Sequence, residues 1–570
     1  MTDKMLSTLS LLLFCQLLIV TTVNCDKSIV ASHSGLVQGV PLRTLLENKE
    51  YMAYRGIPYA KPPVGDLRFK VPVPIAPWQG IYPATDYGNS CLVLEQSNFF
   101  PWNSTQSEDC LYLNVFTPVT SRNKLNAKKA VMFFIHGGAF TEGDGTNGFY
   151  GADFIVEDDV VLVTINYRLG PWGFASFDIE GYTGNMGFKD QQMALEWTHR
   201  NIKYFGGDPN LITVFGESAG GAAVHLQMLS SKSQKLMKRA IPMSGSAFTT
   251  FAHYPPNNHV ELFKQTFGLD AGATGHEVLQ YLLDAPVELI LEKTPVITLD
   301  RNVIGLYFTS VIEDPKKAVN PFLTRTPRDI YRTTNVNVDA MIGVNTAEFI
   351  VVFNPADPYS WIEPMKNYSN IGLPFTGLTL SPDSPVYQEA AEKIYKFYFG
   401  DRELEPTVEN LDTFLEMGTD MNFIYPAYQS LRFHSARANT FCYLNDLSLN
   451  LNAVKITENI EYLDGMAHFE DLQYLFWSKK YAQLYQNVLA NPTDPINQKT
   501  IRALNFVPKM FTNYAKKGRP TVFGGYSEWC NACTLVTNDG PVPMFGLRKK
   551  KMEFWDQIYD SVKPWIVNPF

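Results

Sequence analysis

The stretch Leu211-Ile212-Thr213-Val214-Phe215-Gly216-Glu217-Ser218-Ala219-Gly220 joins an apolar run to a turn of small residues. The β-branched and aromatic residues at 211–215 favour a strand that is buried on both faces. Ala222, Leu226 and Leu229 then continue on one face at helical spacing. Such a sharp strand-to-helix turn lifts a serine hydroxyl above the edge of a sheet, and the glycines avoid collisions with neighbouring backbone. We predict that Ser218 is a nucleophile; the alternative is a purely structural Gly-Ser turn.

Other segments around this stretch predict the rest of a sheet. Apolar runs predict strands at 131–135, 160–165, 240–244 and 338–344, and helical spacing of apolar residues predicts helices at 190–205 and 552–562. Strands that alternate with helices indicate a central, mostly parallel, twisted sheet flanked by helices, which is the α/β class. The chain has no fixed-period repeat, low-complexity tract or linker. We therefore expect one domain over residues 26–570, with helical insertions.

A glycine-rich loop follows the strand predicted at 131–135. His136-Gly137-Gly138-Ala139-Phe140 stands where a loop that binds an oxyanion lies relative to the serine turn. The backbone N–H groups of Gly137, Gly138 and Ala219 are the predicted donors to the oxygen that becomes negative in a tetrahedral intermediate. A plain Gly-Gly turn is the alternative.

A serine hydroxyl needs a base, and that base needs an acid to orient it. His468 follows Gly465 in the last third of the chain, as expected for the order serine, acid, histidine. Glu348 follows the strand predicted at 338–344 and is the predicted acid. Asp464, Glu470 and Asp471 compete with it, but they are so close to His468 in sequence that we expect them to shape its loop.

Composition excludes one class of partner. The 570 residues carry a net charge of −9 and a pI near 5.6, which argues against binding to nucleic acid. The short basic run at 548–551 is interpreted as a solvated turn before the last helix.

The N-terminus has the features of an export signal. Leu11 to Val20 forms a short apolar core, and Val23-Asn24-Cys25 offers a cleavage site, so residues 1–25 are a predicted signal peptide. An uncleaved anchor is the alternative, but the run is short for a membrane span. We expect a secreted, extracellular protein without a stable membrane anchor.

Five cysteines remain after removal of the signal: Cys91, Cys110, Cys442, Cys530 and Cys533. Because five is odd, at least one thiol stays free or pairs outside the chain. The Cys530–Cys533 pair raises the possibility of zinc, but a structural site needs four ligands and no second pair lies nearby. We predict no metal and no cofactor. The sequons at Asn103 and Asn367 are candidate glycosylation sites.

Several further motifs accompany the serine turn and the His-Gly-Gly loop. They are Arg55-Gly56-Ile57-Pro58-Tyr59-Ala60, Ser107-Glu108-Asp109-Cys110-Leu111-Tyr112-Leu113-Asn114, Asn166-Tyr167-Arg168-Leu169-Gly170, Phe205-Gly206-Gly207-Asp208-Pro209 and Tyr474-Leu475-Phe476. With them the chain resembles the type-B carboxylesterase and cholinesterase-like family, and looks most similar to its secreted insect members.

The resemblance implies an α/β-hydrolase fold and several site features. It implies hydrolysis of a small hydrophobic carboxylic ester through an acyl-enzyme, with Ser218, His468 and Glu348 as the triad. It also implies a disulfide between Cys91 and Cys110. By the same resemblance, Ser244 is similar to a buried serine near the triad, and Glu217 to a second buried carboxylate.

The chain departs from the family in ways that leave the substrate open. It has no cysteine between Cys110 and Cys442, Phe349 follows the predicted acid where many members have glycine, and juvenile-hormone esterases often carry glutamine at position 217. A cholinesterase activity, with Trp102 as a candidate choline-binding residue, and a juvenile-hormone-esterase-like activity remain alternatives. A non-catalytic adhesion or binding protein is a further alternative, and the pairing of Cys442, Cys530 and Cys533 stays open.

Overall fold

A computed structural model describes most of the chain. Its described residues are 28–94, 105–118, 128–253, 258–295, 297–520, 525–526 and 531–567. The signal peptide predicted over 1–25, Trp102, the sequon residue Asn103 and Cys530 lie outside these ranges.

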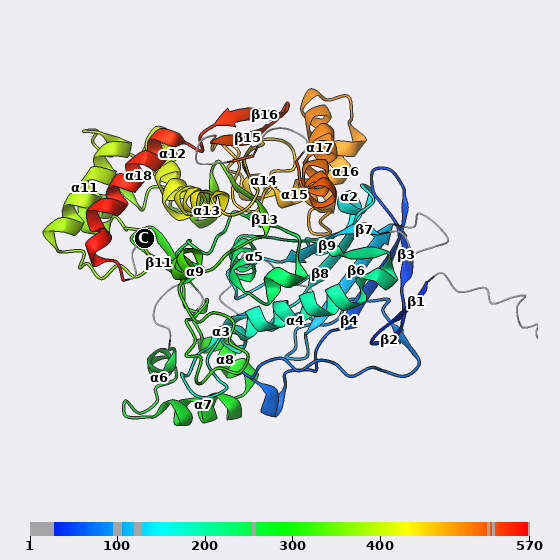
Figure 1. Cartoon of the computed structure of the whole chain (residues 1–570). Helices are drawn as coiled ribbons and strands as arrows, with labels where there is room; N and C mark the ends of the chain where they lie inside the picture. Colours follow the sequence, from blue (N-terminus) through cyan, green and yellow to red (C-terminus); the bar gives the residue numbers. More distant parts are fainter. Residues whose placement is uncertain are drawn as a thin grey trace, which may run out of the picture.

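A sheet of eleven strands organises the molecule (Figure 1). Its spatial order is β16-β15-β14-β13-β10-β9-β7-β8-β6-β4-β3. The bounds in that order are β16 (Gly540–Phe545), β15 (Ala532–Thr537), β14 (Thr440–Asp446), β13 (Asp339–Asn345), β10 (Arg239–Met243), β9 (Gly207–Glu217), β7 (Lys129–Ile135), β8 (Val161–Ile165), β6 (Tyr112–Pro118), β4 (Glu50–Pro58) and β3 (Val40–Arg43).

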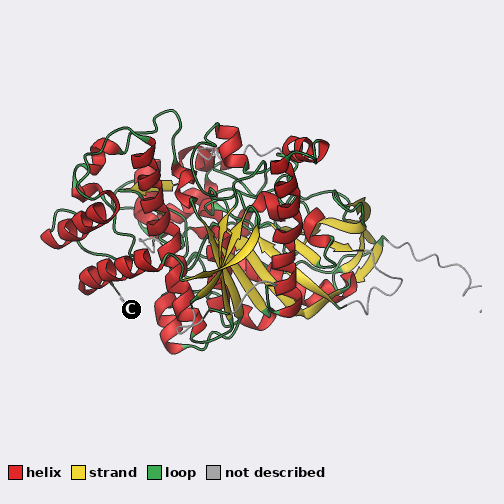
Figure 2. Ribbon diagram, turned by 90° about the horizontal axis from the view of Figure 1, so that it is seen from above, coloured by secondary structure: helices red, strands yellow, loops and turns green. Residues whose placement is uncertain are grey.

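The middle of this sheet is parallel and its edges are antiparallel. Strands β8, β7, β9, β10, β13, β14 and β15 pair in parallel, whereas β3, β4 and β6 at one edge and β16 at the other pair in antiparallel fashion. Seen from above, the strands fan out with a pronounced twist and helices surround them (Figure 2). The predicted α/β-hydrolase architecture is confirmed.

Alternating side chains of β7 bury the sheet on both faces. Val131, Phe133 and Ile135 join one apolar core, and Met132 and Phe134 join the other. Helices α4 (Met186–Asn201), α5 (Ala219–Leu229) and α13 (Tyr425–Ser435) contribute to the first core, and α2 (Asp153–Val156), α15 (Leu472–Leu475) and α17 (Pro495–Lys517) to the second. This double cover explains why the central strands are apolar throughout.

The predicted elements form at the expected places. The helix predicted at 190–205 is α4 continued by a 3₁₀ turn, Ile202–Phe205, and it ends at Gly206, whose φ of 88° is left-handed. The last helix is α18 (Lys549–Val562).

The remaining elements are shorter or belong to the insertions. They are β1 (Ile29–Ser32), β2 (Gly35–Gln38), β5 (Ile81–Pro83), β11 (Ile297–Asp300), β12 (Val303–Leu306), α3 (Gly170–Phe174), α6 (Val260–Phe267), α7 (Gly275–Asp284), α8 (Val287–Lys293), α9 (Pro327–Thr333), α10 (Ile362–Met365), α11 (Pro385–Phe399), α12 (Val408–Thr419), α14 (Ala453–Glu458) and α16 (Ala482–Ala490).

Two disulfides form within the described residues. Cys91 pairs with Cys110, as the family resemblance implied. Cys442 of β14 pairs with Cys533 of β15, which resolves a pairing that the sequence left open. Because Cys533 is oxidised, the Cys530–Cys533 pair does not provide two thiolates for zinc. In the described ranges no group of three or more His, Cys, Asp or Glu side chains is arranged to hold a metal.

The interpretation of residues 548–551 as a solvated turn is wrong for two of its members. The side chains of Arg548 and Lys551 are only 17% and 26% exposed, because both pair with acidic residues of the α12 region. Lys549 and Lys550 are exposed, as expected. Among the helices that the structure describes, none combines the length and apolar composition of a membrane span.

Candidate active site

Ser218 lies on the tight turn between β9 and α5. Its φ of 60° and ψ of −126° are strained for a residue with a Cβ. The backbone of Ile135 passes so close that a Cβ on Gly216 or Gly220 would lie 2.4 or 2.2 Å from its carbonyl oxygen. The N–H of Ser218 donates to the carbonyl of Met243 on the neighbouring strand at 2.9 Å. Glycines at both positions therefore allow this turn to sit between two strands.

Ser218 lines a cavity of about 430 Å³ at the carboxyl ends of the parallel strands. Ala139, Glu217 and His468 also line this cavity. Much of its wall is apolar, with side chains from several connections, among them Phe251, Ile304, Leu306, Ile350, Phe353 and Phe423. The serine hydroxyl thus faces a space that suits a hydrophobic molecule.

The predicted oxyanion loop lies directly beside the serine. A Cβ on Gly137 would lie 3.1 Å from the Cβ of Ser218. Gly138, Ala139 and Phe140 have consecutive positive φ values of 96°, 52° and 57°. These values make a tight turn of the backbone directly after Gly137. Ala219 opens α5, and the first amide of a helix has no acceptor within that helix.

Glu348 and His468 contact each other, although 120 residues separate them. Glu348 begins a 3₁₀ turn after β13, and its Oε2 lies 2.5 Å from Nδ1 of His468. Its other oxygen accepts from the backbone N–H of Asn345 at 2.6 Å. Both side chains are buried, with His468 only 6% exposed. The carboxylate therefore fixes the imidazole from one side.

The three acidic residues that were alternatives to Glu348 have different surroundings. Glu470 is buried and accepts from the backbone N–H groups of Ala467 and Lys455, both at 2.9 Å. Asp471 is also buried and accepts from the side chain of Asn345 at 3.3 Å. Asp464 is exposed. Glu470 thus shapes the histidine loop, and it is Glu348 that reaches Nδ1.

The other nitrogen of His468 faces Glu217. Nε2 lies 3.1 Å from Oε1 of Glu217, whose side chain is 2% exposed. Burial raises the pKa of Glu217 to about 8 and that of Asp471 to about 7. Burial lowers the pKa of His468, but the carboxylates of Glu217 and Glu348 outweigh it and raise that pKa to about 9. When Glu217 is protonated, the largest contribution that raises the pKa of His468 is therefore lost.

Phe349, the residue that departs from the family pattern, packs against α12. Its ring packs where Gly418 has no side chain, since a Cβ there would lie 2.2 Å from the ring. Its N–H donates to Oγ1 of Thr419 at 3.0 Å. Ser244, the other residue implied by resemblance, is buried just after β10 and has a φ of 51°.

Sequence reasoning missed most of the residues that line the cavity, among them Phe423 and Ala139. Phe423 lies with its ring centroid 5.0 Å from that of His468, and it belongs to a π-helical turn, Asp420–Ile424. No sequence pattern links that turn to the site. Ala139 could have been included, because it directly follows the two glycines of the oxyanion loop.

The twisted, largely parallel sheet and the serine turn after its central strand define the class: this is an α/β-hydrolase. The sequence profile of the Carboxylesterase family matches residues 26–557. The chain belongs to the carboxylesterase family and is an ester-hydrolysing enzyme.

Individual relatives agree with this assignment. Juvenile hormone esterase of Heliothis virescens is 30% identical over 531 residues, which cover 91% of each chain. Cholinesterase of Mus musculus is 33% identical over 565 residues, or 94% of this chain and 87% of its own. The crystal structure of juvenile hormone esterase from Manduca sexta, with OTFP covalently attached, has a TM-score of 0.79 at 26% identity. It covers 93% of this chain and 99% of that one.

Proposed function

We propose that the protein is a secreted serine hydrolase that cleaves small hydrophobic carboxylic esters through an acyl-enzyme. One observation carries the proposal: Ser218 lies on a strained turn in the cavity that His468 also lines, and His468 is held by Glu348. Strain of this kind persists where the surrounding structure enforces it, and it clusters at reactive groups.

Acylation begins when Ser218 attacks the ester carbonyl. Nε2 of His468 turns from Glu217 to the serine hydroxyl, accepts its proton and passes that proton to the departing alcohol. Catalytic hydrogen bonds of free enzymes are often longer than those of the substrate complex. The backbone N–H groups of Gly137, Gly138 and Ala219 stabilise the negative oxygen of the tetrahedral intermediate, and each such donor is worth about 10²–10³ in rate.

Deacylation repeats the same chemistry with water. His468 removes a proton from the attacking water, and the proton then returns to Ser218 as the acid product leaves. Glu348 keeps the proton of the neutral imidazole on Nδ1 and stabilises the imidazolium that forms in each half-reaction. No step requires a metal or an organic cofactor.

The walls of the cavity suit the apolar part of an ester. Its apolar walls bury aliphatic or aromatic chains. Lys480 lines the same cavity, and its ammonium lies 5.3 and 5.4 Å from the ring centroids of Phe149 and Tyr481. Lys480 thus occupies the face of Tyr481 that would otherwise attract a cationic alcohol group, although the carboxylates of Glu142 and Glu458 line the same cavity. The Lys480 contact is the one observation that favours a general hydrophobic esterase over a cholinesterase.

Several features support secretion of the domain at 26–570. Disulfides such as Cys91–Cys110 and Cys442–Cys533 persist in oxidising compartments. Asn367, in the second sequon, is exposed and open to a glycan, although its side chain accepts hydrogen bonds from Ser369. We include this site in the proposal.

The test replaces the proposed nucleophile. Ser218→Ala should abolish hydrolysis of 1-naphthyl acetate and labelling by a fluorophosphonate, while the melting temperature stays nearly unchanged. Ser244→Ala is the matched control, because that serine is also buried after a central strand but does not line the cavity. It should keep both activities, and labelling of the Ser218→Ala variant would refute the proposal.

The same preparation distinguishes the substrate classes. We expect kcat/KM for acetylthiocholine to be lower than that for its uncharged isostere, 3,3-dimethylbutyl thioacetate. A clear preference for the cation would favour a cholinesterase. If wild-type protein has neither turnover nor labelling, the non-catalytic binding protein becomes the better interpretation.

A further inference from the structure

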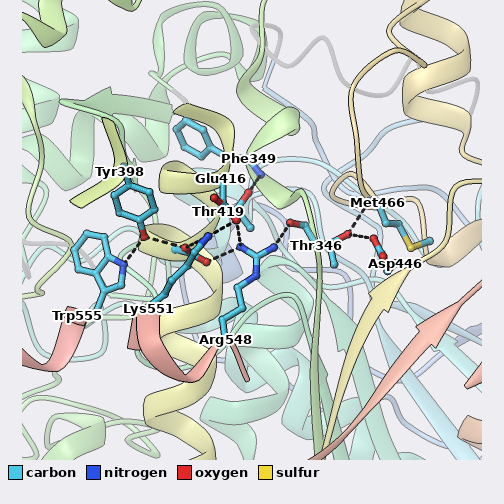
Figure 3. Close-up of polar contacts among 11 residues, drawn as sticks. Thr346, Phe349, Tyr398, Glu416, Thr419, Asp446, Met466, Arg548, Lys551 and Trp555 are labelled. Atoms are coloured by element: carbon cyan, nitrogen blue, oxygen red, sulfur yellow. Dashed lines mark hydrogen bonds and ion pairs between the residues drawn. The ribbon is translucent and has the colours of Figure 1, made fainter. Parts of the chain in front are cut away.

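A partly buried ion-pair cluster joins the last helix to the active-site side of the molecule (Figure 3). Nη1 of Arg548 donates to Oδ1 of Asp420 at 2.7 Å, and Tyr398 donates to the other oxygen of Asp420 at 2.8 Å. The side chain of Asp420 is fully buried. Lys551, one helical turn later, contacts Glu416 and lies 3.8 Å from Asp420. This cluster, formed by Arg548, Lys551, Asp420 and Glu416, is called the α18 cluster below.

One hydrogen bond of the α18 cluster leaves it and reaches the turn that carries the proposed acid. Nη2 of Arg548 donates to the carbonyl oxygen of Thr346 at 2.7 Å. Thr346 is two residues before Glu348 and 202 residues away from Arg548. The planar guanidinium thus holds Asp420 with one nitrogen and the acid turn with another.

Thr346 continues the connection to the histidine loop. Its hydroxyl donates to Asp446 at 2.8 Å and accepts from the backbone N–H of Met466 at 3.0 Å. The N–H of Ala347 donates to the carbonyl of Met466 at 2.9 Å, and Ala347 forms a β-bridge with Ala467. The acid turn and the histidine loop therefore form one hydrogen-bonded unit, which Arg548 contacts from outside.

A second path from the same place reaches the imidazole. Asp420 begins the π-helical turn that carries Phe423, whose ring packs against His468. Thr419, just before Asp420, accepts from the N–H of Phe349 beside the proposed acid. Phe349, which follows Glu348, is thus bonded to the residue before Asp420. Phe423, which packs against His468, belongs to the turn that Asp420 begins.

We propose that Arg548 is a positioning residue of the reaction: paired with Asp420, it holds the Thr346 carbonyl and thereby fixes Glu348 against His468. This inference rests on the proposed triad. Removing the guanidinium frees the acid turn to move, and a displacement of about 1 Å in a reacting group lowers rates by about 10²-fold. Burial already raises the pKa of Asp420, so after loss of its partner Asp420 accepts a proton more readily than an exposed carboxyl, which lowers the cost of the change to the fold.

The test compares Arg548→Met with Lys551→Met. Both changes remove one positive charge from the α18 cluster, but only Arg548 contacts Thr346. For Arg548→Met we expect kcat per fluorophosphonate-titrated site to fall by about tenfold or more, while KM changes little. The acid limb of kcat/KM should move to lower pH, because a looser Glu348 no longer raises the pKa of His468. Lys551→Met should retain the wild-type kcat and pH profile, and Arg548→Lys should recover part of the lost rate.

A purely structural role gives a different result. It would lower the number of titratable sites or the melting temperature of both variants, with kcat per site and the pH profile unchanged, and that result overturns the inference. If Arg548→Met does not fold, Arg548→Lys decides the matter, because its single ammonium keeps the positive charge beside Asp420 but lacks the planar fork that also reaches the Thr346 carbonyl. Arg548→Lys should then show a smaller drop in kcat and a pH shift in the same direction, and a wild-type kcat and pH profile in this variant would overturn the inference.

The two proposals fail separately. Turnover that persists in Ser218→Ala refutes the proposed function and this inference together. Turnover that depends on Ser218 but is unaffected in kcat and pH profile by Arg548→Met or, where that variant does not fold, by Arg548→Lys refutes the positioning role alone.

Discussion

Glu217 and Glu348 contact opposite nitrogens of one imidazole, and they have different consequences for its proton. Glu348 accepts from Nδ1 and fits the tautomer that a base requires. Glu217 lies against Nε2, the nitrogen that must accept the proton of Ser218. While Glu217 is ionised, it therefore competes with the serine and keeps His468 protonated.

Neutralising Glu217 should consequently shift the pH dependence of the reaction. Glu217→Gln removes a negative charge that raises the pKa of His468, so the acid limb of kcat/KM should move to lower pH by about one to three units. The measurement is kcat/KM for 1-naphthyl acetate between pH 5 and 9. Glu458→Gln, which also lines the cavity, is the control and should keep the wild-type profile. An unchanged limb in Glu217→Gln would contradict the arrangement.

At the residue scale, sequence patterns located groups whose neighbours in the chain are distinctive. Ser218 lies between two glycines after a strand, and Glu348 follows a strand whose apolar run is visible. Phe423 and Arg548 had no such signal, because their roles depend on contacts with residues far away in the sequence. Phe423 contacts His468, 45 residues later, and Arg548 contacts Thr346, 202 residues earlier. A run of basic residues, taken alone, predicts side chains exposed to solvent. Only the fold reveals the acidic partners of Arg548.

Among the elements, three helices are joined by a buried chain of hydrogen bonds. His225 of α5 accepts from the N–H of Ala247 at Nδ1 and therefore donates from Nε2 to Tyr331 of α9 at 2.7 Å. Tyr331 donates to Nδ1 of His434 on α13 at 3.2 Å, and His434 donates from Nε2 to the carbonyl of Val338 at 2.6 Å. Both imidazoles are neutral in this chain, and each acceptor nitrogen already faces a donor.

These histidines should make the fold sensitive to acid. Burial lowers the pKa of His225 to about 3 and that of His434 to about 4, from an ordinary value of 6.5. Between pH 6.5 and about 4 the unfolded chain binds protons that the folded chain does not, so stability is present above pH 6.5 and is lost as the pH falls. Each histidine contributes up to about 1.4 kcal/mol per pH unit.

The slope of unfolding free energy against pH tests this expectation. His225→Gln should reduce the slope between pH 6.5 and 4.5 in urea unfolding, whatever its effect at pH 7. His276→Gln, at an exposed histidine, should leave the slope unchanged. Equal slopes in wild type and His225→Gln would show that His225 does not carry the effect.

The sequence identified elements best where both faces of a strand are buried. The runs in β7, β8 and β9 are apolar throughout because helices cover both sides of the sheet. The pairing of Cys442 with Cys533 could not be derived in this way. It depends on β14 and β15 lying side by side, although 91 residues separate the two cysteines.

For the whole molecule, this long-range disulfide should contribute more stability than the local one. Loop-entropy arguments give about 4.5 kcal/mol for a closed loop of 91 residues and about 3 kcal/mol for one of 19. We expect the double variant Cys442→Ala/Cys533→Ala to lower the melting temperature more than Cys91→Ala/Cys110→Ala does. Cys530→Ala should leave it unchanged, and a loss in that variant equal to the loss in Cys533→Ala would contradict the pairing.

The cavity takes its walls from many separate connections: the loop after β7, the turn after β9, strand β12, the turn after β13, the π-helical turn and the segments around α14 and His468. Each connection returns to its own strand, so a change of length or composition in one leaves the pairing of the others intact. Selectivity can therefore diverge one wall at a time during evolution, without any change to the groups at the carboxyl ends of the central strands.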